Sequence, residues 1–586
     1  MSAFCDIWIG SKETKVQPHY YRNGNQNWTP KSMAGLSFWQ SMPEGRSFDY
    51  LQEFGSATYH MIVLGQFYEP IDMSKLLAVC SSYVDGTSKE FNDPAGHYLI
   101  FFTDLRDSSS YVFTNRLGTY HMYHSTEAGV NALGTYYLGL AKTTRDKQLD
   151  WEGITGFLGM GFFQDDTTYL KNIKVLLPAS CYRFDRQLNL ISHSRYWNWS
   201  YDPKPHTIKE YTEQLHNAMT SSISYAISGK RVALPISGGL DSRTLAGIMT
   251  ASGTHAANNI WSFSYGYTPS SVETRIAGKI ASSRNIPFDS YTLPNYLFDK
   301  MEVIKDAVEM FQYVDGTRQA SMKELLEEKS DLVIGGHWGD VWLDDMGITD
   351  NNGAAREEGL QAAFGKKIIK KGSEWLLDNV SGQHFANGRQ HLEDYFRDFA
   401  DQYRHIEDAD FVMKIFKTDQ WSFRWTLASI RMYQAAVFPV LPFYDKRVVD
   451  LFLQIPTSVV AGRQLQIDYL KQYHPDLAKI TWQEYGNNLY WYKHFNNRNI
   501  AYRAIDKIRR SIKGEQPITR NWEIFYLNDN GRRQLEKILL QSPFRDVVPE
   551  STSRALLNDL YRHPNAGNGY AISMLHTFAR FIEAIA

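Results

Sequence analysis

Hydrophobic and polar residues follow two different periods along the chain. Residues 59–64, 97–102 and 111–113 are short runs of aromatic and β-branched residues separated by Gly, Asp and Ser, a pattern typical of strands in a sandwich of sheets. Residues 211–227 instead place their apolar side chains on one face of a helix. We therefore predict an antiparallel β sandwich over residues 1–200, followed by a domain of another class.

Beyond this point, strand-like runs alternate with helical patterns. Residues 232–236 and 260–266 are apolar strand candidates, and a helical stretch follows each of them. This alternation predicts a doubly wound parallel sheet, with its ligand site at the carboxyl ends of the strands. The Pro-rich segment 201–206 is the predicted linker, which makes residues 207–586 the second domain.

The first strand of that second domain leads into a glycine-rich turn. Residues 237–242 read Ser-Gly-Gly-Leu-Asp-Ser, and a helical pattern begins directly after them. The glycines allow the backbone to approach a phosphate, the exposed N–H groups point at it, and the helix dipole favours its charge. The turn lacks the GK[ST] ending of the P-loop, the other common phosphate-binding loop, so no lysine reaches the outer phosphates. Asp241 is placed instead to hold a Mg²⁺ that binds the phosphates.

This turn resembles the pyrophosphate loop of the ATP pyrophosphatases. With its surroundings, it is similar to the synthetase domain of asparagine synthetases and their relatives, the β-lactam synthetases and lasso-peptide cyclases. Residues 335–340, Gly-Gly-His-Trp-Gly-Asp, resemble the family's Gly-Glu-Gly-Ala-Asp-Glu motif. The resemblance implies a degenerate class-II glutaminase-like (Ntn) sandwich, then an ATP-pyrophosphatase domain with a helical C-terminal part.

The same resemblance implies ATP and Mg²⁺ as the bound cofactors. Asp340 becomes the second carboxylate on Mg²⁺–pyrophosphate, opposite Asp241, and the main chain near Tyr265 faces the purine. An N-cap of the following helix is the alternative role for Asp340, and the two roles can coexist. The residues expected to bind the nucleotide are Ile236, Ser237, Gly238, Gly239, Asp241, Ser242, Tyr265, Gly335 and Gly336.

Two departures from the family concern catalysis. His337 replaces a glutamate at a position where β-lactam synthetases have a tyrosine that takes part in deprotonating the attacking amine. Imidazole titrates near neutral pH, so His337 is a candidate base; a structural histidine that bonds a neighbouring loop is the alternative. The family's lysine in an Arg-x-Lys loop has no counterpart in residues 480–487, and Lys471 and Lys493 are the nearby candidates to replace it.

The N-terminal domain lacks the family's nucleophile, a cysteine freed by removal of Met1. Position 2 is Ser2, and Cys5 comes three residues too late. A serine needs strong activation by a base, so we predict a scaffold that no longer hydrolyses glutamine; an active N-terminal Ser2 hydrolase is the alternative.

Composition excludes several functional classes. The 586 residues carry a formal charge of −2 without a long basic run, which argues against a nucleic-acid partner. No apolar run approaches the ~18–20 residues of a membrane span, and the N-terminus lacks the blocks of a signal peptide. Cys5, Cys80 and Cys181 never form a CxxC pair, so we expect a cytoplasmic protein without disulfides.

The resemblance to the asparagine synthetase family implies an ATP-dependent, AMP-forming amide ligase, in which a carboxylate is adenylated and then attacked by an amine. We expect a tailoring or macrolactam-forming enzyme of a peptide or other natural product. Its expected partners are a carboxylate substrate and an amine acceptor such as a precursor peptide. We also allow for a homodimer. The alternatives are a non-catalytic ATP-fold scaffold or binding protein, a surface-polysaccharide modifying amidotransferase and a tRNA-modifying pyrophosphatase. Residues 345–420, an insertion relative to the family, either shape the acceptor pocket or form solvated surface.

Overall fold

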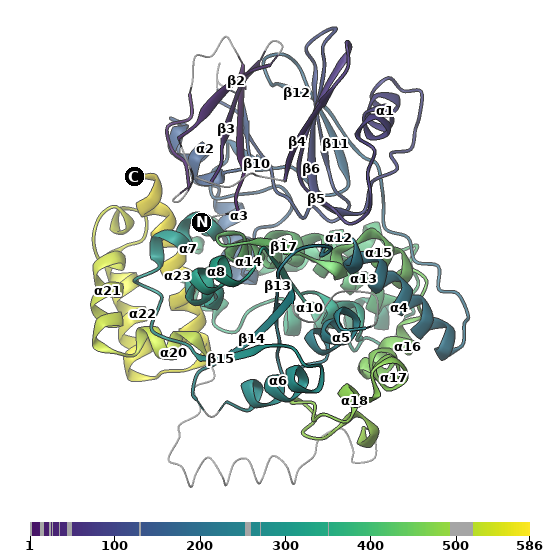
Figure 1. Ribbon diagram of the computed structural model, residues 1–586. Coiled ribbons are helices and arrows are strands. Elements are labelled where there is room, and N and C mark those ends of the chain that lie inside the picture. The colour runs from purple at the N-terminus through teal and green to yellow at the C-terminus, as the bar shows by residue number, and fades with distance from the viewer. Residues whose placement is uncertain are drawn as a thin grey trace.

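In the residues that it describes, the computed structural model has a mixed α/β fold with two antiparallel sheets, one parallel sheet and many helices. The two antiparallel sheets face each other in the upper part of Figure 1, and the parallel sheet lies below them among helices. The residues that the structure describes are 3–11, 17–22, 25, 27–33, 36–43, 50–127, 131–251, 259–269, 271–349, 351–492 and 520–586.

The predicted N-terminal sandwich is built from two six-stranded sheets. The first contains β1 (Asp6–Ser11), β2 (Thr29–Met33), β3 (Leu36–Ser41), β8 (Tyr123–Ser125), β9 (Ala132–Gly134) and β10 (Ile173–Val175), in the order β10-β8-β9-β1-β3-β2. The second contains β4 (Leu51–Gly55), β5 (Tyr59–Phe67), β6 (Gly96–Asp104), β7 (Ser110–Thr114), β11 (Ser180–Phe184) and β12 (Leu190–Arg195), in the order β12-β11-β7-β6-β5-β4. All pairings within both sheets are antiparallel, as the sequence pattern predicts.

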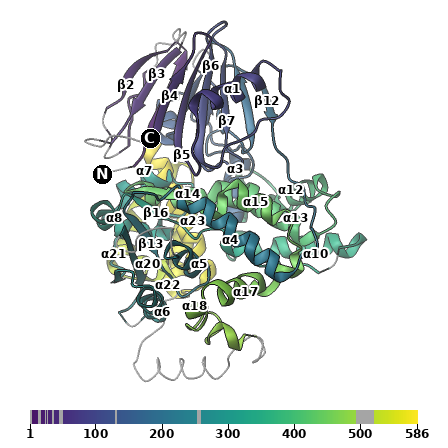
Figure 2. The ribbon, with the colours of Figure 1, turned by 45° about the vertical axis from the view of Figure 1, so that its right-hand side comes forward.

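Strand β6 shows why the hydrophobic runs form this structure. Leu99 and Phe101 point into the large core between the sheets, whereas Ile100 and Phe102 point to the opposite face. Helix α1 (Met73–Val84) covers that outer face with Leu76, Leu77 and Cys80, and Figure 2 shows it lying outside the sheet. Because both faces are covered, every residue of β6 is buried and the strand reads as a nearly continuous apolar run.

The parallel sheet has the strand order β15-β14-β13-β16-β17. Its strands are β13 (Val232–Pro235), β14 (Ile260–Gly266), β15 (Phe288–Thr292), β16 (Leu332–Ile334) and β17 (Phe438–Val440), and all four pairings are parallel. Along the sequence, this sheet starts at its central strand β13 and extends through β14 to the edge strand β15. The chain then returns to form β16 on the other side of β13. The direction of winding therefore reverses between β13 and β16, and such a reversal leaves a crevice at the carboxyl ends of the two strands.

Pro235, which lacks an N–H group, is tolerated in this central strand because it is the last residue of β13. The ladder continues one residue later, where the N–H of Ile236 donates to the carbonyl of Phe263 at 2.8 Å.

Helices surround the parallel sheet (Figure 1). Those before β17 are α2 (Tyr137–Thr143), α3 (Trp151–Met160), α4 (Ile208–Ser224), α5 (Asp241–Met249), α6 (Val272–Ser283), α7 (Met301–Val308), α8 (Lys323–Lys329), α9 (Gly339–Trp342), α10 (Gly353–Lys367), α11 (Ser373–Asn379), α12 (Gly388–Gln402), α13 (Ala409–Phe416) and α14 (Leu427–Gln434). After β17 come α15 (Lys446–Phe452), α16 (Thr457–Val460), α17 (Gln464–Tyr473), α18 (Pro475–Ala478), α20 (Asn521–Tyr526), α21 (Asp529–Leu539), α22 (Glu550–Arg562) and α23 (Ala566–Ile585). Helices α10 to α13 occupy the stretch 345–420, and a π-helix, Lys417–Thr426, joins α13 to α14.

A buried group of charges ties the sandwich to the helices beside the parallel sheet. Arg22 pairs with Asp6 of β1 and with Glu309 after α7, each at 2.7 Å, and Arg431 of α14 pairs with Glu309 at 2.6 Å. Glu309 is fully buried, and Arg22 is 1% exposed. This buried ion-pair network therefore joins the two parts of the chain.

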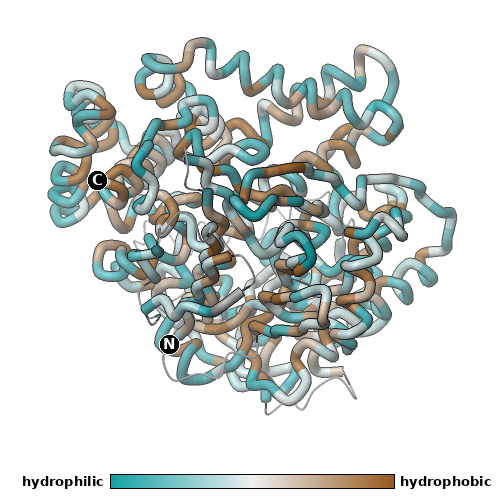
Figure 3. The backbone as a smooth tube through the Cα atoms, turned by 90° about the horizontal axis from the view of Figure 1, so that it is seen from above, coloured by the Kyte–Doolittle hydropathy of each residue, from teal (hydrophilic) through white to brown (hydrophobic). Residues whose placement is uncertain are grey.

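Hydrophobic segments gather in the interior when the molecule is seen from above, and hydrophilic ones dominate its outlying helices (Figure 3). None of the helices within the described ranges is both long and apolar enough to span a bilayer.

Candidate active site

The predicted phosphate turn follows β13 and is held by its own hydroxyl groups. The Ser237 N–H donates to Ser242 Oγ at 3.0 Å, and the two hydroxyl oxygens lie 3.1 Å apart. The Gly239 N–H donates to Ser237 Oγ at 3.2 Å. Ile236, just before the turn, is 2% exposed. The two serines thus close the turn internally, which fixes its backbone before any ligand binds.

Helix α5 begins at this turn with an open N-terminus. Its N-cap residue, Leu240, provides no side-chain hydrogen bond to the first turn of the helix. The first N–H groups of a helix have no partner within the helix, and the helix dipole adds a partial positive charge at the same end. An anion is the natural partner for such an end, as the sequence predicts.

Asp241, the first residue of α5, lies directly against the segment after β16. A Cβ atom at Gly339 would be 2.7 Å from Asp241 Cγ, and one at Gly336 would be 3.4 Å from Asp241 Cβ. The two predicted loops, separated by about a hundred residues of sequence, are therefore in contact at the crevice between β13 and β16. Only glycine at position 339 leaves room for the Asp241 carboxylate.

Two side chains from the later part of the chain hold the Asp241 carboxylate. Arg463 donates to Oδ1 at 2.5 Å, and Gln466 donates to the same oxygen at 3.0 Å. The Asp241 side chain keeps 21% of its exposure, so it remains open to solvent on one side. Burial raises the pKa of Asp241; the Arg463 guanidinium opposes this effect, and the nearby Asp340 adds to it.

Asp340 is exposed on α9 and close enough to Asp241 to affect its titration. The N-cap of α9 is Trp338, with a φ of 76°, so Asp340 lies inside the helix and the alternative role of an N-cap is wrong. Among the residues that the structure describes, no three His, Cys, Asp or Glu side chains form a metal cluster. Two accessible carboxylates still suit Mg²⁺, which binds one or two carboxylates and takes its other ligands from phosphates and water.

His337 is half-buried beside the same segment, and its role as a base stays a prediction. Its ring meets that of Tyr433 edge-on, with centroids 6.1 Å apart. Nδ1 has no hydrogen-bond partner in the described part of the chain, and a Cβ at Gly335 would lie 2.7 Å from it. Burial lowers the pKa of His337 to about 4, so the imidazole is neutral at pH 7 and able to accept a proton, although it is a weak base.

Tyr265 and Gly335 complete the predicted nucleotide set. Tyr265 is the penultimate residue of β14, and the Arg318 guanidinium lies 5.5 Å from its ring centroid. The Gly335 N–H donates to the carbonyl of Val440 at 2.9 Å, which extends the β16–β17 pairing by one residue. Both positions lie at the carboxyl edge of the sheet, as the sequence predicts.

Residues 480–487, the segment where the resemblance would place the family's lysine loop, lie against the glycine turn. The Gln483 N–H donates to the Gly238 carbonyl at 3.1 Å, and a Cβ at Gly238 would be 2.3 Å from Gln483 Oε1. Arg243 of α5 donates to the carbonyls of Leu477, Ile480 and Thr481. Lys471 lies over the Tyr490 ring at 5.6 Å, and Lys493 falls outside the described residues.

A cation that sequence reasoning missed lies beside Asp340. Lys417, the first residue of the π-helix, is 5.7 Å from the Trp338 ring centroid and 5.0 Å from that of Trp421. Burial lowers the pKa of Lys417, and the Asp340 carboxylate opposes that shift. Arg463, Gln466 and Lys417 carry no local sequence signal for this role. Their role becomes visible only in the folded chain, where each of them lies close to Asp241 or Asp340.

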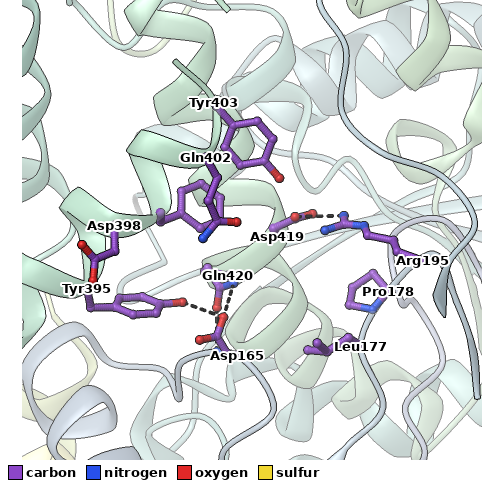
Figure 4. Close-up of a pocket in the computed structure, with 11 residues that line it drawn as sticks. Asp165, Leu177, Pro178, Arg195, Tyr395, Asp398, Gln402, Tyr403, Asp419 and Gln420 are labelled. Atoms are coloured by element: carbon purple, nitrogen blue, oxygen red, sulfur yellow. Dashed lines mark hydrogen bonds and ion pairs between the residues drawn. The ribbon is translucent and has the colours of Figure 1, made fainter. Parts of the chain in front are cut away.

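Two cavities flank the π-helix. One, of about 610 Å³, lies beyond the end of β14 and is lined by aromatic and basic side chains. The other, of about 380 Å³, is drawn in Figure 4. There, Tyr395 and Gln420 donate to Asp165 at 2.9 and 3.1 Å, and Arg195 pairs with Asp419 at 2.9 Å. Because those polar groups already have one another as partners, we assign this second cavity no part in the site.

The N-terminal end of the sandwich offers no thiol nucleophile among the described residues. Cys5 is fully buried, and burial and the neighbouring Asp6 raise the pKa of its thiol well above the usual range. Ser2 lies outside the described residues. Cys80 and Cys181 are buried free thiols as well.

Comparisons with known proteins add little to this geometry. No family model matches the chain. No curated protein matches it either. Among solved structures, it is similar to a glutamine-dependent NAD⁺ synthetase from Acinetobacter baumannii in complex with ADP (19% identity, TM-score 0.17), over 28% of this chain and 30% of that one. It is also similar to a glutamine phosphoribosylpyrophosphate amidotransferase from B. subtilis complexed with ADP and GMP (7% identity, TM-score 0.17), over 49% of this chain and 59% of that one. The chain thus spans less than two thirds of either structure, and likenesses this low carry no argument about its function.

Proposed function

We propose that this protein is an ATP-dependent, AMP-forming carbon–nitrogen ligase with an ATP-pyrophosphatase domain behind a degenerate glutaminase-like sandwich. One observation carries the proposal: the glycine turn with Asp241 meets the segment from Gly335 to Asp340 where the winding of the sheet reverses. The turn supplies backbone donors and an open helix N-terminus, and the two aspartates supply carboxylates. This donor set suits the pyrophosphate of ATP with a divalent cation.

The proposed reaction proceeds in two displacements. A carboxylate oxygen of the acid substrate forms a bond to the α-phosphorus of ATP, and the bond from that phosphorus to the oxygen bridging to the β-phosphate breaks, which releases pyrophosphate. An amine nitrogen then forms a bond to the acyl carbon, and AMP leaves as the amine loses a proton. Most of the catalysis is the positioning of reactants and the stabilisation of charge, so main-chain donors suffice.

Each site residue has a role in this scheme. Ser237, Gly238, Gly239 and Ser242 hold the pyrophosphate, while Ile236, Tyr265, Gly335 and Gly336 border the nucleoside. Asp241 and Asp340 would hold Mg²⁺, which when bound supplies positive charge to the phosphates of ATP. Lys417 adds a further cation near Asp340. We assign His337 the task of accepting the amine proton, because its Nδ1 has no hydrogen-bond partner within the described ranges.

The amine donor follows from the N-terminal domain. With Cys5 buried and its thiol pKa raised, we infer that the sandwich does not release ammonia from glutamine. The amine then comes from a second substrate, from free ammonia or from the acid-bearing molecule itself. A tailoring or macrolactam-forming role in peptide or other natural-product synthesis fits this inference.

The decisive experiment is carboxylate-dependent exchange of labelled pyrophosphate into ATP, preceded by calorimetric binding of ATP·Mg²⁺. Asp241→Asn and Asp340→Asn should each weaken ATP·Mg²⁺ binding at least tenfold. Asp331→Asn is the matched control, because Asp331 lies just before the same strand β16 but at its opposite end, paired with Arg231. Wild-type binding in both test variants would refute the assignment of the two aspartates.

A non-catalytic nucleotide-binding protein is the second candidate, and one contact favours it. Arg463 already occupies Oδ1 of Asp241 at 2.5 Å, a position that competes with a cation. ATP·Mg²⁺ binding without pyrophosphate exchange across a broad panel of carboxylic acids would favour this second candidate.

A further inference from the structure

The cavity of about 610 Å³ beside the candidate nucleotide site has aromatic walls. Trp421 and Trp425 of the π-helix meet edge-on at 6.1 Å, and Tyr313 lies 5.7 Å from Trp425. Trp522 of α20 lines the same space. Ligand pockets typically enclose 300–1,000 Å³ and are dominated by such side chains, so the size and the walls suit a planar ligand.

The same cavity carries an excess of positive charge. Lys370, Lys371, Arg318 and Arg520 line it, against two acids, Glu273 and Asp315. Within the described part of the chain, Lys370 and Lys371 have no ion-pair partner, and Lys370 Nζ lies 3.9 Å from the Trp421 ring centroid. Burial, together with the charge of Lys417, lowers the pKa of Lys370 to about 8. A buried cation without a counter-ion is unfavourable, and an anionic ligand would relieve it.

Asp315 does not neutralise this charge. Its side chain is 3% exposed, and Oδ1 has no hydrogen-bond partner among the described residues. Burial raises its pKa to about 7, so near neutral pH the carboxyl is protonated in a large fraction of molecules. A protonated carboxyl can donate a hydrogen bond to an anion. Asp315 thus has one carboxyl oxygen without a partner at the cavity wall, while its side chain also forms hydrogen bonds with Ser573 and Tyr526.

The cavity adjoins the nucleotide site through one side chain. Lys417 Nζ lies 5.0 Å from the Trp421 ring centroid, which belongs to the cavity wall, and 5.7 Å from that of Trp338, between Gly336 and Asp340. The Lys417 side chain therefore lies between a ligand packed against Trp421 and the segment 335–340. Lys370 and Lys371 belong to the stretch 345–420, so this stretch helps to shape the cavity.

We propose that this cavity binds a carboxylic acid with an aromatic or otherwise planar body, its ring against Trp421 and Trp425 and its carboxylate toward Lys370. That this ligand is the acid to be adenylated rests on the proposed function. Binding itself does not, because the aromatic walls, and Lys370 and Lys371 without ion-pair partners among the described residues, belong to the free protein.

The test uses 2-naphthoate as the probe, with the full-length protein and isothermal titration calorimetry at pH 7. The neutral 2-naphthamide, which has the same ring system, measures the contribution of charge. Naphthoate should bind at least tenfold more tightly than naphthamide. Lys370→Met, which retains the aliphatic stem, should weaken naphthoate binding at least tenfold and change naphthamide binding little, whereas Trp421→Leu should weaken both. No detectable naphthoate binding, or equal affinities for the two probes, would overturn the proposal.

Matched controls separate the cavity from general effects. Lys366→Met, at the end of α10, and Trp375→Leu, on α11, remove the same side chains outside the cavity and should leave naphthoate binding unchanged. ATP·Mg²⁺ binding measured on the same samples distinguishes the two proposals. Loss of naphthoate binding with intact ATP binding concerns the cavity alone. Naphthoate binding without any ATP binding would retain the cavity and remove the ligase.

Discussion

Gly339→Ala should disable the site without unfolding the protein. The new Cβ would lie 2.7 Å from Asp241 Cγ, 2.9 Å from Asp241 Oδ1 and 2.9 Å from Phe443 Cζ. Ordinary carbon contacts are about 3.5–4.0 Å, so one of these groups has to move by roughly 1 Å. Phe443 is fully buried in the core, whereas Asp241 is partly exposed. The Asp241 carboxylate is therefore the group that yields.

The size of the effect follows from the geometry that Mg²⁺ requires. Its ligand distances are about 2.0–2.1 Å and nearly invariant, so a displacement of ~1 Å removes a carboxylate from coordination. Interactions of charged hydrogen-bonding groups contribute about 1.5–3 kcal/mol each, which corresponds to a weakening of ATP·Mg²⁺ binding by roughly ten- to a hundredfold.

Calorimetric titration with ATP·Mg²⁺ measures this loss, and thermal unfolding followed by circular dichroism confirms that the variant is folded. Gly365→Ala is the control for the chemical change alone, because its Cβ would have no neighbour closer than 3.6 Å, the Arg389 guanidinium, within helix α10. Unchanged affinity in a folded Gly339→Ala protein would show that Asp241 is not a phosphate or metal ligand.

Three further outcomes are expected. Glu309→Gln should lower the free energy of unfolding in urea by about 3–5 kcal/mol, since it breaks a buried ion-pair network, whereas Glu302→Gln, 70% exposed on the neighbouring helix, should change it by less than about 0.5 kcal/mol. Burial, with the charges of Arg284 and His216, lowers the pKa of His474 to about 3; the unfolded chain therefore binds more protons between pH 7 and 5, and stability falls as the pH falls. His474→Gln should reduce that fall by about 2 kcal/mol in urea titrations at the two pH values, and an unchanged slope would contradict the argument. Lys417→Met should weaken ATP·Mg²⁺ binding about tenfold by calorimetry; an unchanged Kd would exclude Lys417 from the site.

The sequence predicts the parts of this molecule whose signals are local. The apolar runs of β5, β6 and β14 are dictated by burial on both faces, and each forms within a few residues of its expected bounds. The turn at residues 237–242 is likewise a local signal, because glycines and hydroxyls next to a strand and a helix have few other uses. The alternation of strands and helices also predicts the parallel sheet.

What the sequence does not predict is the set of side chains that converge from afar. Arg463 and Gln466 approach Asp241 from more than two hundred residues away, and Lys417 approaches Asp340 from the end of an inserted helical stretch. Each is an ordinary polar residue on a helix or loop, and nothing in its neighbourhood distinguishes it from a solvated one. The N-cap role considered for Asp340 was wrong for a related reason: Trp338 adopts a left-handed backbone conformation, so α9 starts one residue earlier than Asp340.

The continuous helical run from Ala409 to Gln434 carries ten residues of wider winding in its middle. Asp419 and Gln420 point into one chamber, while Trp421 and Trp425 point into the other. Residues of an α-helix are spaced by about 100° of rotation, so deleting a single amino acid here would turn both sets of side chains together. A change in chain length by one position, rather than any substitution, is thus the smallest genetic step that would remodel both chambers at once.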